Sequence, residues 1–184
     1  MAVALYLVRH GQAAAGWDVD PDPGLSEQGV QQALDVRDCF AAQAPVELVS
    51  SPLRRAVQTA GPLAQAWQST LHIDPVFREI PAPQGISMQD RIGWLLSIRD
   101  QDWGQASDEL WRWRDAIQAR LQQIEQPAII FTHFMVMNLV AGIATGCERM
   151  VHYQPANGSV LSLTRSGDVL QIADWGAQAP SRVL

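Results

Sequence analysis

The sequence predicts a three-layer α/β/α sandwich with a mostly parallel central sheet and a short helical insert. Two short apolar runs, residues 3–8 (VALYLV) and 128–132 (AIIFT), have the length and composition of buried parallel strands. Strands that alternate with helices form a sheet covered on both faces. The chain has 184 residues, enough to bury a sizeable core within one domain. We therefore expect a single domain over residues 1–184, with the helical insert at about 80–126.

The first half of the chain alternates predicted strands and helices, namely a strand at 3–8, a helix at 27–43, a strand at 46–49, a helix at 53–67 and a strand at 71–73. Ser26 stands directly before the first helix, and serine is a preferred N-cap residue. Ser51 and Pro52 predict the start of the second helix, because serine caps helices and proline is favoured at their first position. Each of the first two strands is thus followed by a helix, as in a parallel β-α-β unit.

The insert at 80–126 differs in composition from the rest of the chain. It predicts two helices and carries four of the seven tryptophans, Trp94, Trp103, Trp111 and Trp113. Two interpretations of these indoles stay open, since they either line a ligand site or pin the insert to the domain. Trp111 and Trp113 are two positions apart on a helix and do not share a face, so we expect at most one of them to pack into the core.

Two further strand signals close the chain. A strand at 128–132 is followed by a helix at 134–144. Residues 159–164 and 169–173 then predict a pair of strands joined around Ser166-Gly167-Asp168, a run of turn-forming residues. The expected end of the domain is therefore a hairpin.

The charge composition excludes several functions. The formal net charge is −6, and all thirteen basic residues are arginine, with no lysine. A P-loop and Schiff-base chemistry both require lysine, so both are excluded. An acidic chain without a basic run is also poorly suited to the phosphate backbone of nucleic acids. We therefore expect no nucleic-acid partner.

Cysteine usage and hydropathy favour a cytoplasmic protein with no membrane partner. Cys39 and Cys147 are too few for a disulfide framework and match no zinc spacing, so we expect two reduced thiols. Residues 1–11 turn polar too soon for a signal peptide. The most apolar stretch, 128–146, is interrupted by histidine, asparagine and threonine, so it predicts a buried strand and helix and not a membrane span.

Polar side chains follow three of the predicted strands. Arg9 and His10 end the first strand. Residues 51–55 (SPLRR) follow the second, and His133 follows the strand at 128–132. Ligand sites of open α/β sheets lie at the carboxyl ends of the strands, so these histidines and arginines should meet there. A neutral imidazole is a competent nucleophile, and arginine binds phosphate oxygens with two parallel hydrogen bonds, so the pattern predicts phosphoryl transfer.

Several motifs, in their order along the chain, resemble those of the histidine phosphatase superfamily, also called the phosphoglycerate mutase-like family. They are LVRHGQ at 7–12, LSEQGVQQA at 25–33, SSPLRRAVQTA at 50–60, FRE at 77–79, FTH at 131–133 and NGS at 157–159. The resemblance covers nearly the whole chain. It implies that the insert lies over the catalytic pocket.

Carried over residue by residue, the resemblance implies a role for each matched side chain. His10 would be the nucleophile that becomes phosphohistidine, and Glu79 would protonate the leaving oxygen and then activate water. The phosphoryl oxygens would be held by the remaining matched side chains, Arg9, Arg55 and His133, with Gln12 and Asn157 as secondary contacts. Ser51 would support these residues from outside the pocket.

The resemblance implies a metal-independent phosphatase that acts on a small phosphorylated metabolite and needs no cofactor. The insert is short for a mutase, which favours a phosphatase over a mutase. Two other enzymes stay open, a phosphoglycerate-type mutase and a phosphatase for phosphohistidine in a partner protein. A phosphate-ester sensor or scaffold without turnover is the non-enzymatic hypothesis. The triplet Asp18, Asp20 and Asp22 lacks the glycine and glutamate of a calcium loop and predicts a solvated loop.

Overall fold

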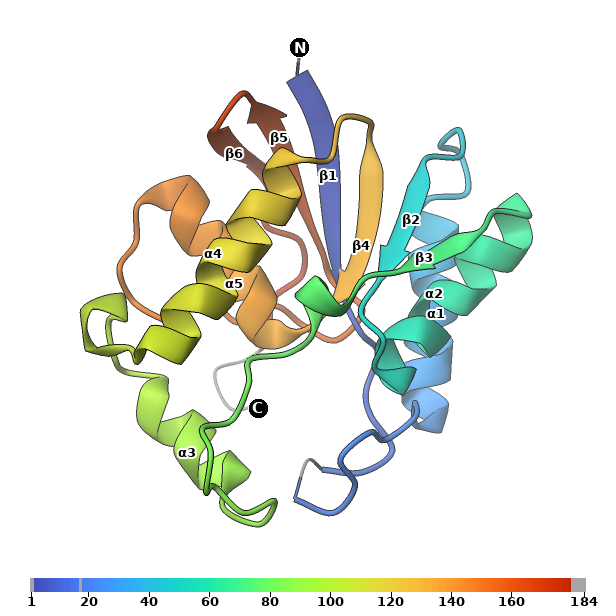
Figure 1. The fold of residues 1–184 in the computed structure, drawn as a ribbon. Coiled ribbons are helices and arrows are strands. Elements are labelled where there is room, and N and C mark those ends of the chain that lie inside the picture. The colour runs from blue at the N-terminus through green and yellow to red at the C-terminus, as the bar shows by residue number, and fades with distance from the viewer. Residues whose placement is uncertain (1, 17, 180–184) are drawn as a thin grey trace.

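One six-stranded sheet forms the centre of the computed structural model, which describes residues 2–16 and 18–179 (Figure 1). The strands are β1 (Ala2–Arg9), β2 (Glu47–Ser50), β3 (Leu71–Ile73), β4 (Ala128–Thr132), β5 (Val160–Ser166) and β6 (Val169–Asp174). Their order across the sheet is β3-β2-β4-β1-β5-β6. The pairs β1–β4, β4–β2 and β2–β3 are parallel, and β5 runs antiparallel to both of its neighbours, β1 and β6. The mostly parallel sheet predicted from the sequence is confirmed.

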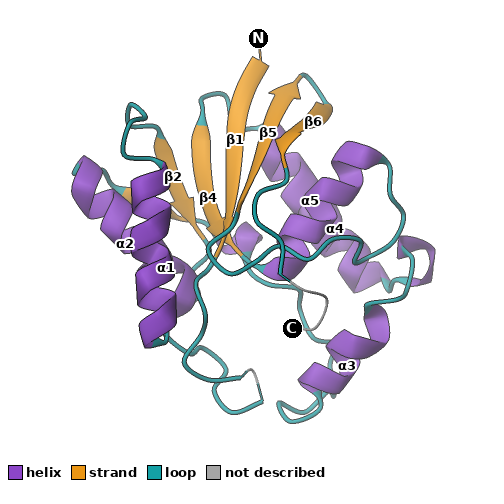
Figure 2. Ribbon diagram, turned by 180° about the vertical axis from the view of Figure 1, so that it is seen from behind, coloured by secondary structure: helices purple, strands orange, loops and turns teal. Residues whose placement is uncertain are grey.

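Helices cover both faces of this sheet. They are α1 (Glu27–Cys39), α2 (Arg54–Trp67), α3 (Arg91–Ile98), α4 (Asp108–Gln122) and α5 (Phe134–Thr145). α1 and α2 lie on one face and α4 and α5 on the other, as the view from behind also shows (Figure 2). A separate apolar cluster of buried side chains fills each helix–sheet interface, so the predicted three layers are confirmed. Across residues 2–16 and 18–179, no helix has the length and apolar content needed to span a membrane.

The two helices within residues 80–126 lie in different places. α4 contacts α5 and belongs to an outer layer, whereas α3 lies beyond the carboxyl ends of the strands (Figures 1 and 2). A short 3₁₀ turn, Pro75–Phe77, leads from β3 toward α3 and packs on α4. Asp74 at the start of this turn accepts a 2.7 Å hydrogen bond from Arg120 of α4. The segment that carries Glu79 is thereby fixed to the outer layer.

Three of the four tryptophans of this region form a packed cluster centred on Trp103, which is only 2% exposed. The rings of Trp111 and Trp113 both approach it, with centroids 5.7 and 6.4 Å from that of Trp103. The expectation that at most one of the two packs into the core is wrong, because Trp103 lies on a separate turn that both long indole side chains reach. Neither these three residues nor Trp94 line the pocket described below, so the indoles pin the insert to the domain.

The end of α1 and the start of α2 differ from the prediction. α1 ends at Cys39 and not at 43, because the Phe40 ring turns into the apolar cluster beneath the helix. α2 begins at Arg54, and its N-cap residue is Leu53, which makes no side-chain cap hydrogen bond. The interpretation of Ser51 as the cap of this helix is therefore wrong. Its hydroxyl contacts a histidine ring, as shown below.

Candidate active site

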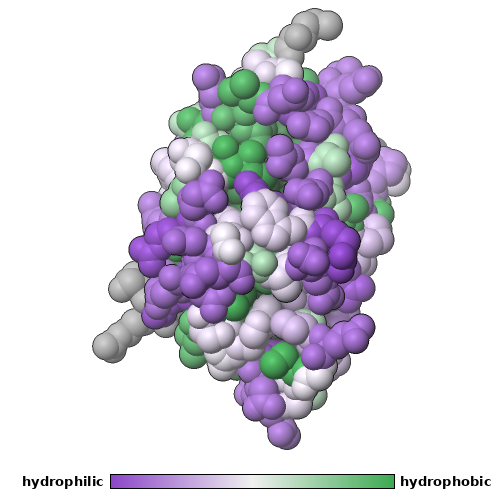
Figure 3. Space-filling view, turned by 60° about the vertical axis from the view of Figure 1, so that its left-hand side comes forward, coloured by the Kyte–Doolittle hydropathy of each residue, from purple (hydrophilic) through white to green (hydrophobic). Residues whose placement is uncertain are grey.

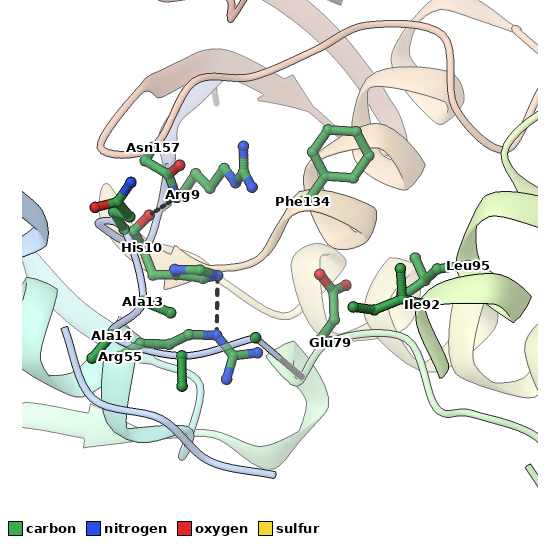
Figure 4. Close-up of a pocket in the computed structure, with 13 residues that line it drawn as sticks. Arg9, His10, Ala13, Ala14, Arg55, Glu79, Ile92, Leu95, Phe134 and Asn157 are labelled. Carbon is green, nitrogen blue, oxygen red and sulfur yellow. Dashed lines mark hydrogen bonds between the residues drawn. The ribbon is translucent and has the colours of Figure 1, made fainter. Parts of the chain in front are cut away.

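A pocket of about 430 Å³ opens at the carboxyl edge of the sheet, next to α3 (Figure 4). Six of the eight residues singled out from the sequence line it, namely Arg9, His10, Gln12, Arg55, Glu79 and Asn157. The other two, Ser51 and His133, are fully buried. The volume is within the range of about 300–1,000 Å³ that is usual for small-ligand sites. The fold thus brings distant parts of the chain together where the parallel strands end.

His10 is held at the end of β1 by the backbone around it. Its N–H donates to the carbonyl of Thr132 at 3.0 Å, and its ring Nδ1–H donates to the carbonyl of Gly11 at 2.7 Å. Because Nδ1 carries the proton, Nε2 keeps a lone pair, and Nε2 accepts a 3.1 Å hydrogen bond from Nε of Arg55. Burial, together with the charges of Arg55 and Arg9, holds the pKa of His10 well below 6.5. The imidazole is therefore neutral at physiological pH.

Two arginines provide positive charge beside this ring. Nη1 of Arg9 donates to the carbonyl of Pro155 at 2.7 Å, and its guanidinium lies over the Phe134 ring, 5.1 Å from the centroid. Burial lowers the pKa of Arg9 to about 10 and also lowers the pKa of Arg55. A pKa of about 10 leaves Arg9 charged at neutral pH. The pocket therefore has the donors and the charge to bind an anionic group next to His10.

Thr59 connects the loop after β1 to α2. Its hydroxyl accepts from the N–H of Gly11 at 2.9 Å and donates to the carbonyl of Arg55 at 2.6 Å. Both bonds are buried, so one side chain fixes the backbone beside His10 relative to that of Arg55. Thr59 is not among the site residues predicted from the sequence. The signal was its position four residues after Arg55, which places the two residues on the same side of a helix.

α1 presses against the same loop. A Cβ atom at Gly29, in the first turn of α1, would overlap the carbonyl oxygen of Gln12, and one at Gly11 would lie 2.5 Å from the carbonyl oxygen of Gly29. Only residues without a side chain allow this approach of two backbones. The side-chain oxygen of Gln12 also accepts from the Ser26 hydroxyl at 2.8 Å. The start of α1 therefore fixes the course of the chain after His10.

Glu79 lies across the pocket from His10 (Figure 4). Its Oε1 accepts from the N–H of Ile80 at 3.0 Å and from the N–H of Met135 at 3.1 Å. Met135 is in the first turn of α5, so the positive end of a helix faces the carboxylate. Burial is the largest influence on this group and raises the pKa of Glu79 above 4.5, against the effect of these hydrogen bonds and of Arg55. The carboxyl group is thus suited to hold a proton and release it.

His133 and Ser51 lie together behind the pocket wall. His133 is the N-cap residue of α5, and its Nε2 is 2.7 Å from the Ser51 hydroxyl in a hydrogen bond. The His133 ring packs on that of His10, with centroids 5.1 Å apart. Burial, with His10 and Arg55 nearby, holds the pKa of His133 well below 6.5. A second neutral imidazole therefore supports the first, and Ser51 orients it.

The last predicted residue, Asn157, lies in the loop before β5. Its amide Nδ2 donates to the carbonyl of His10 at 3.1 Å, and the N–H of Gly158 donates to the carbonyl of Arg9 at 3.0 Å.

In the parts of the chain that the structure describes, no group of three or more His, Cys, Asp or Glu side chains is arranged to hold a metal ion. Asp22 accepts from the backbone N–H of Arg54 at 2.8 Å, so it joins its loop to the start of α2.

Comparison with known families agrees with this geometry. The family model described as the histidine phosphatase superfamily (branch 1) matches residues 5–178. The chain belongs to this superfamily. The match spans every strand except the first residues of β1, and it includes all eight residues singled out from the sequence.

Its relatives are named as mutases and phosphatases. A protein of Proteus mirabilis (strain HI4320), named probable phosphoglycerate mutase GpmB, is 32% identical over 105 residues, which are 54% of this chain and 46% of that relative. This chain therefore aligns with about half the length of that relative. The solved mycobacterial glucosyl-3-phosphoglycerate phosphatase is 21% identical, with 97% of this chain and 100% of that chain covered and a TM-score of 0.74. A putative alpha-ribazole-5'-P phosphatase from Escherichia coli K-12 is 18% identical, with 96% and 98% covered and a TM-score of 0.75. At these identities the two structures establish a shared fold.

Proposed function

We propose that this protein is a phosphatase that hydrolyses a small phosphomonoester through a phosphohistidine on His10, without a metal ion. The observation that carries the proposal is the state of the His10 ring. Its Nδ1–H donates to the carbonyl of Gly11, so Nε2 is unprotonated, and its lone pair accepts a hydrogen bond from Arg55. Arg9 and Arg55 supply the positive charge that a metal ion supplies in other phosphoryl-transfer sites.

In the first step, Nε2 of His10 attacks phosphorus as the bond from phosphorus to the leaving alcohol oxygen breaks. Glu79 gives its proton to that oxygen, so a neutral alcohol leaves. Arg9 and Arg55 bind the non-bridging oxygens and stabilise their charge in the transition state. The Arg55 N–H that contacts Nε2 in the free protein turns to a phosphoryl oxygen when substrate binds. The product is a phosphorus–nitrogen bond on His10.

In the second step, the Glu79 carboxylate takes a proton from water, and the water oxygen attacks phosphorus. The phosphorus–nitrogen bond breaks, its electron pair returns to Nε2 of His10, and inorganic phosphate leaves. Of the two carboxyl oxygens, Oε1 is engaged by two backbone N–H groups at 3.0 and 3.1 Å, whereas Oε2 is 3.4 Å from the Met135 nitrogen. Oε2 is therefore the oxygen that carries the proton in both steps.

Phosphate release from an alkyl phosphate tests this function. Activity is expected to persist in a strong chelator, and His10→Ala should lower kcat by several decades, the scale usual for loss of a covalent nucleophile. His72→Ala is the matched control, because His72 is an exposed histidine on β3. Inhibition by chelator that a divalent ion reverses would overturn the metal-free mechanism. Full activity of His10→Ala would overturn the nucleophile.

A phosphoglycerate-type mutase is the second candidate, favoured by the name of the Proteus relative. A mutase returns the phosphoryl group to a second hydroxyl of the same substrate, so it must retain the intermediate and exclude water. Incubation with 3-phosphoglycerate, followed by phosphorus NMR, separates the two. Inorganic phosphate as the product supports the phosphatase, and 2-phosphoglycerate without phosphate release supports the mutase.

A further inference from the structure

The side of the pocket away from the phosphoryl site is apolar. Among the lining residues that the structure describes, Ile92 and Leu95 of α3 lie on that side, whereas Ala13 and Ala14 lie beside Arg55 at the phosphoryl end (Figure 4). In Figure 4 the charged groups gather around His10, while Ile92 and Leu95 reach in from α3 beyond Glu79. Since Glu79 faces the leaving oxygen in the proposed mechanism, the group attached to that oxygen must extend toward α3.

Positive charge is confined to the other end. Among the lining residues that the structure describes, the cations are Arg9 and Arg55, and both flank His10. Arg78 precedes Glu79 in the chain, but its side chain is exposed and does not line the pocket. A leaving group with its own carboxylate or phosphate would therefore meet apolar side chains and the Glu79 carboxyl group, without a positive partner. Such burial of an unpaired charge is strongly unfavourable.

α3 exposes two apolar side chains. Ile92 is 38% exposed and Leu96 is 44% exposed, although both belong to an eight-residue helix. The space-filling view shows apolar side chains at the lower end of the molecule, at the height of α3 (Figure 3). Single exposed apolar residues are ordinary on protein surfaces. Ile92 differs from Leu96 because it lines the pocket together with Leu95.

We infer that the alcohol part of the substrate is an uncharged, predominantly apolar group that packs against Ile92, Leu95 and Phe134. The inference rests on the proposed phosphatase function. Phe134 has two roles in it, since its ring lies under the Arg9 guanidinium and also forms part of the apolar wall. Phe134 therefore contacts both the residue that binds the phosphoryl group and the proposed site for the apolar group.

A series of ethyl, n-butyl and n-hexyl phosphate, with 3-phosphoglycerate as the charged member, tests the inference. The three alkyl esters have similar leaving alcohols, so differences in kcat/KM report contact with the wall. We expect kcat/KM to rise about three- to fourfold for each methylene that is buried, the factor that corresponds to transfer of one methylene from water. We expect 3-phosphoglycerate to react more slowly than n-butyl phosphate. A flat series, or a preference for 3-phosphoglycerate, would overturn the inference.

Variants of α3 locate the effect. Ile92→Ser and Leu95→Ser should reduce the rise in kcat/KM from ethyl to n-hexyl phosphate at least severalfold. Leu96→Ser is the matched control on the same helix and should keep the full rise, because Leu96 does not line the pocket. An equal effect of Leu96→Ser would contradict the assigned contacts.

The results for wild type and His10→Ala separate the two proposals and do not depend on the folding of the α3 variants. Phosphate release that requires His10 but shows no dependence on chain length leaves the phosphatase in place and overturns the apolar wall. Absence of release from every ester, with His10→Ala indistinguishable from wild type, overturns the proposed function and this inference with it.

Discussion

Replacing Glu79 by glutamine separates proton donation from structure at a single side chain. Oε1 of Glu79 accepts both backbone hydrogen bonds, from Ile80 at 3.0 Å and from Met135 at 3.1 Å. The amide oxygen of glutamine retains both acceptor sites, and the amide group has nearly the shape of the carboxyl group. What the substitution removes is the proton that Oε2 carries. Position and packing are therefore preserved while the acid is lost.

The expected magnitude follows from this geometry. General acid catalysis contributes about 10²–10⁴-fold, so kcat/KM for an alkyl phosphate should fall by that factor, or about 2.7–5.4 kcal/mol of transition-state stabilisation. The free energy of unfolding should change by less than about 1 kcal/mol, because the two shorter backbone hydrogen bonds to Oε1 are kept and only the 3.4 Å contact from Met135 to Oε2 is lost. A large kinetic effect with a small effect on stability is the signature of the proposed role.

The assay compares an alkyl phosphate with p-nitrophenyl phosphate. A phenolate with an acidic parent phenol leaves without a proton, so kcat/KM for the aryl ester, which reports formation of the phosphohistidine, should fall less than about tenfold in Glu79→Gln. Urea unfolding of the same variant supplies the stability control. Equal slowing of both esters would refute the reasoning and assign Glu79 a structural role.

Three further predictions concern pH, close packing and positioning. The kcat/KM for an alkyl phosphate should fall as pH rises through the raised pKa of Glu79, because the acid form of the carboxyl group is lost. No ionisation of His10 should appear near pH 6.5, because its ring stays neutral there; an acid limb in that range beyond the one that the second pKa of the ester, about 6, produces would contradict this. Gly29→Ala should lower the free energy of unfolding by about 1–3 kcal/mol, since its methyl overlaps a backbone oxygen, whereas Gly93→Ala within α3 meets no atom within 4 Å and should raise it by about 0.5–1 kcal/mol. Urea unfolding of the two variants checks this pair. A change of the same sign in both free energies of unfolding would show that the contact between position 29 and the Gln12 carbonyl oxygen does not exclude a side chain. Thr59→Val leaves the buried N–H of Gly11 without an acceptor, so it should lower the free energy of unfolding by about 1–3 kcal/mol and lower kcat more than it raises KM. Thr59→Ser keeps the hydroxyl and should restore both properties. An unchanged kcat in Thr59→Val would rule out a positioning role.

The layers of the fold follow from patterns within short segments. The run at 128–132 is buried at every position in β4, as a central parallel strand requires, and the run at 3–8 lies beside it in β1. Ser26 caps α1 as expected, because its side chain accepts from the N–H of Gly29. The prediction for Ser51 as a helix cap is wrong, because a serine before a proline has the same local pattern whether or not it caps a helix. The contact of its hydroxyl with His133 joins residues far apart in the sequence, so it becomes visible only in the folded chain.

The candidate site could be predicted where polar side chains follow strands or match a motif, and not where apolar side chains line it. Arg9 and His10 were found because the carboxyl ends of parallel strands share one edge. Phe134 and Ile92 were missed, because an apolar residue has the same pattern whether it faces a core or a pocket. The role of Trp103 stayed open for the same reason, and the structure buries this residue against other indoles.

The most direct test of the phosphohistidine is to trap it. Glu79→Gln lacks the base that activates water, so turnover of p-nitrophenyl phosphate by this variant should accumulate the phosphoryl enzyme. Quenching in base, followed by mass spectrometry, should locate one acid-labile phosphoryl group on His10, and the same treatment of a variant that also carries His10→Ala should give none. Release of p-nitrophenol with no phosphoryl group on the protein, or with the group on another residue, would contradict the account.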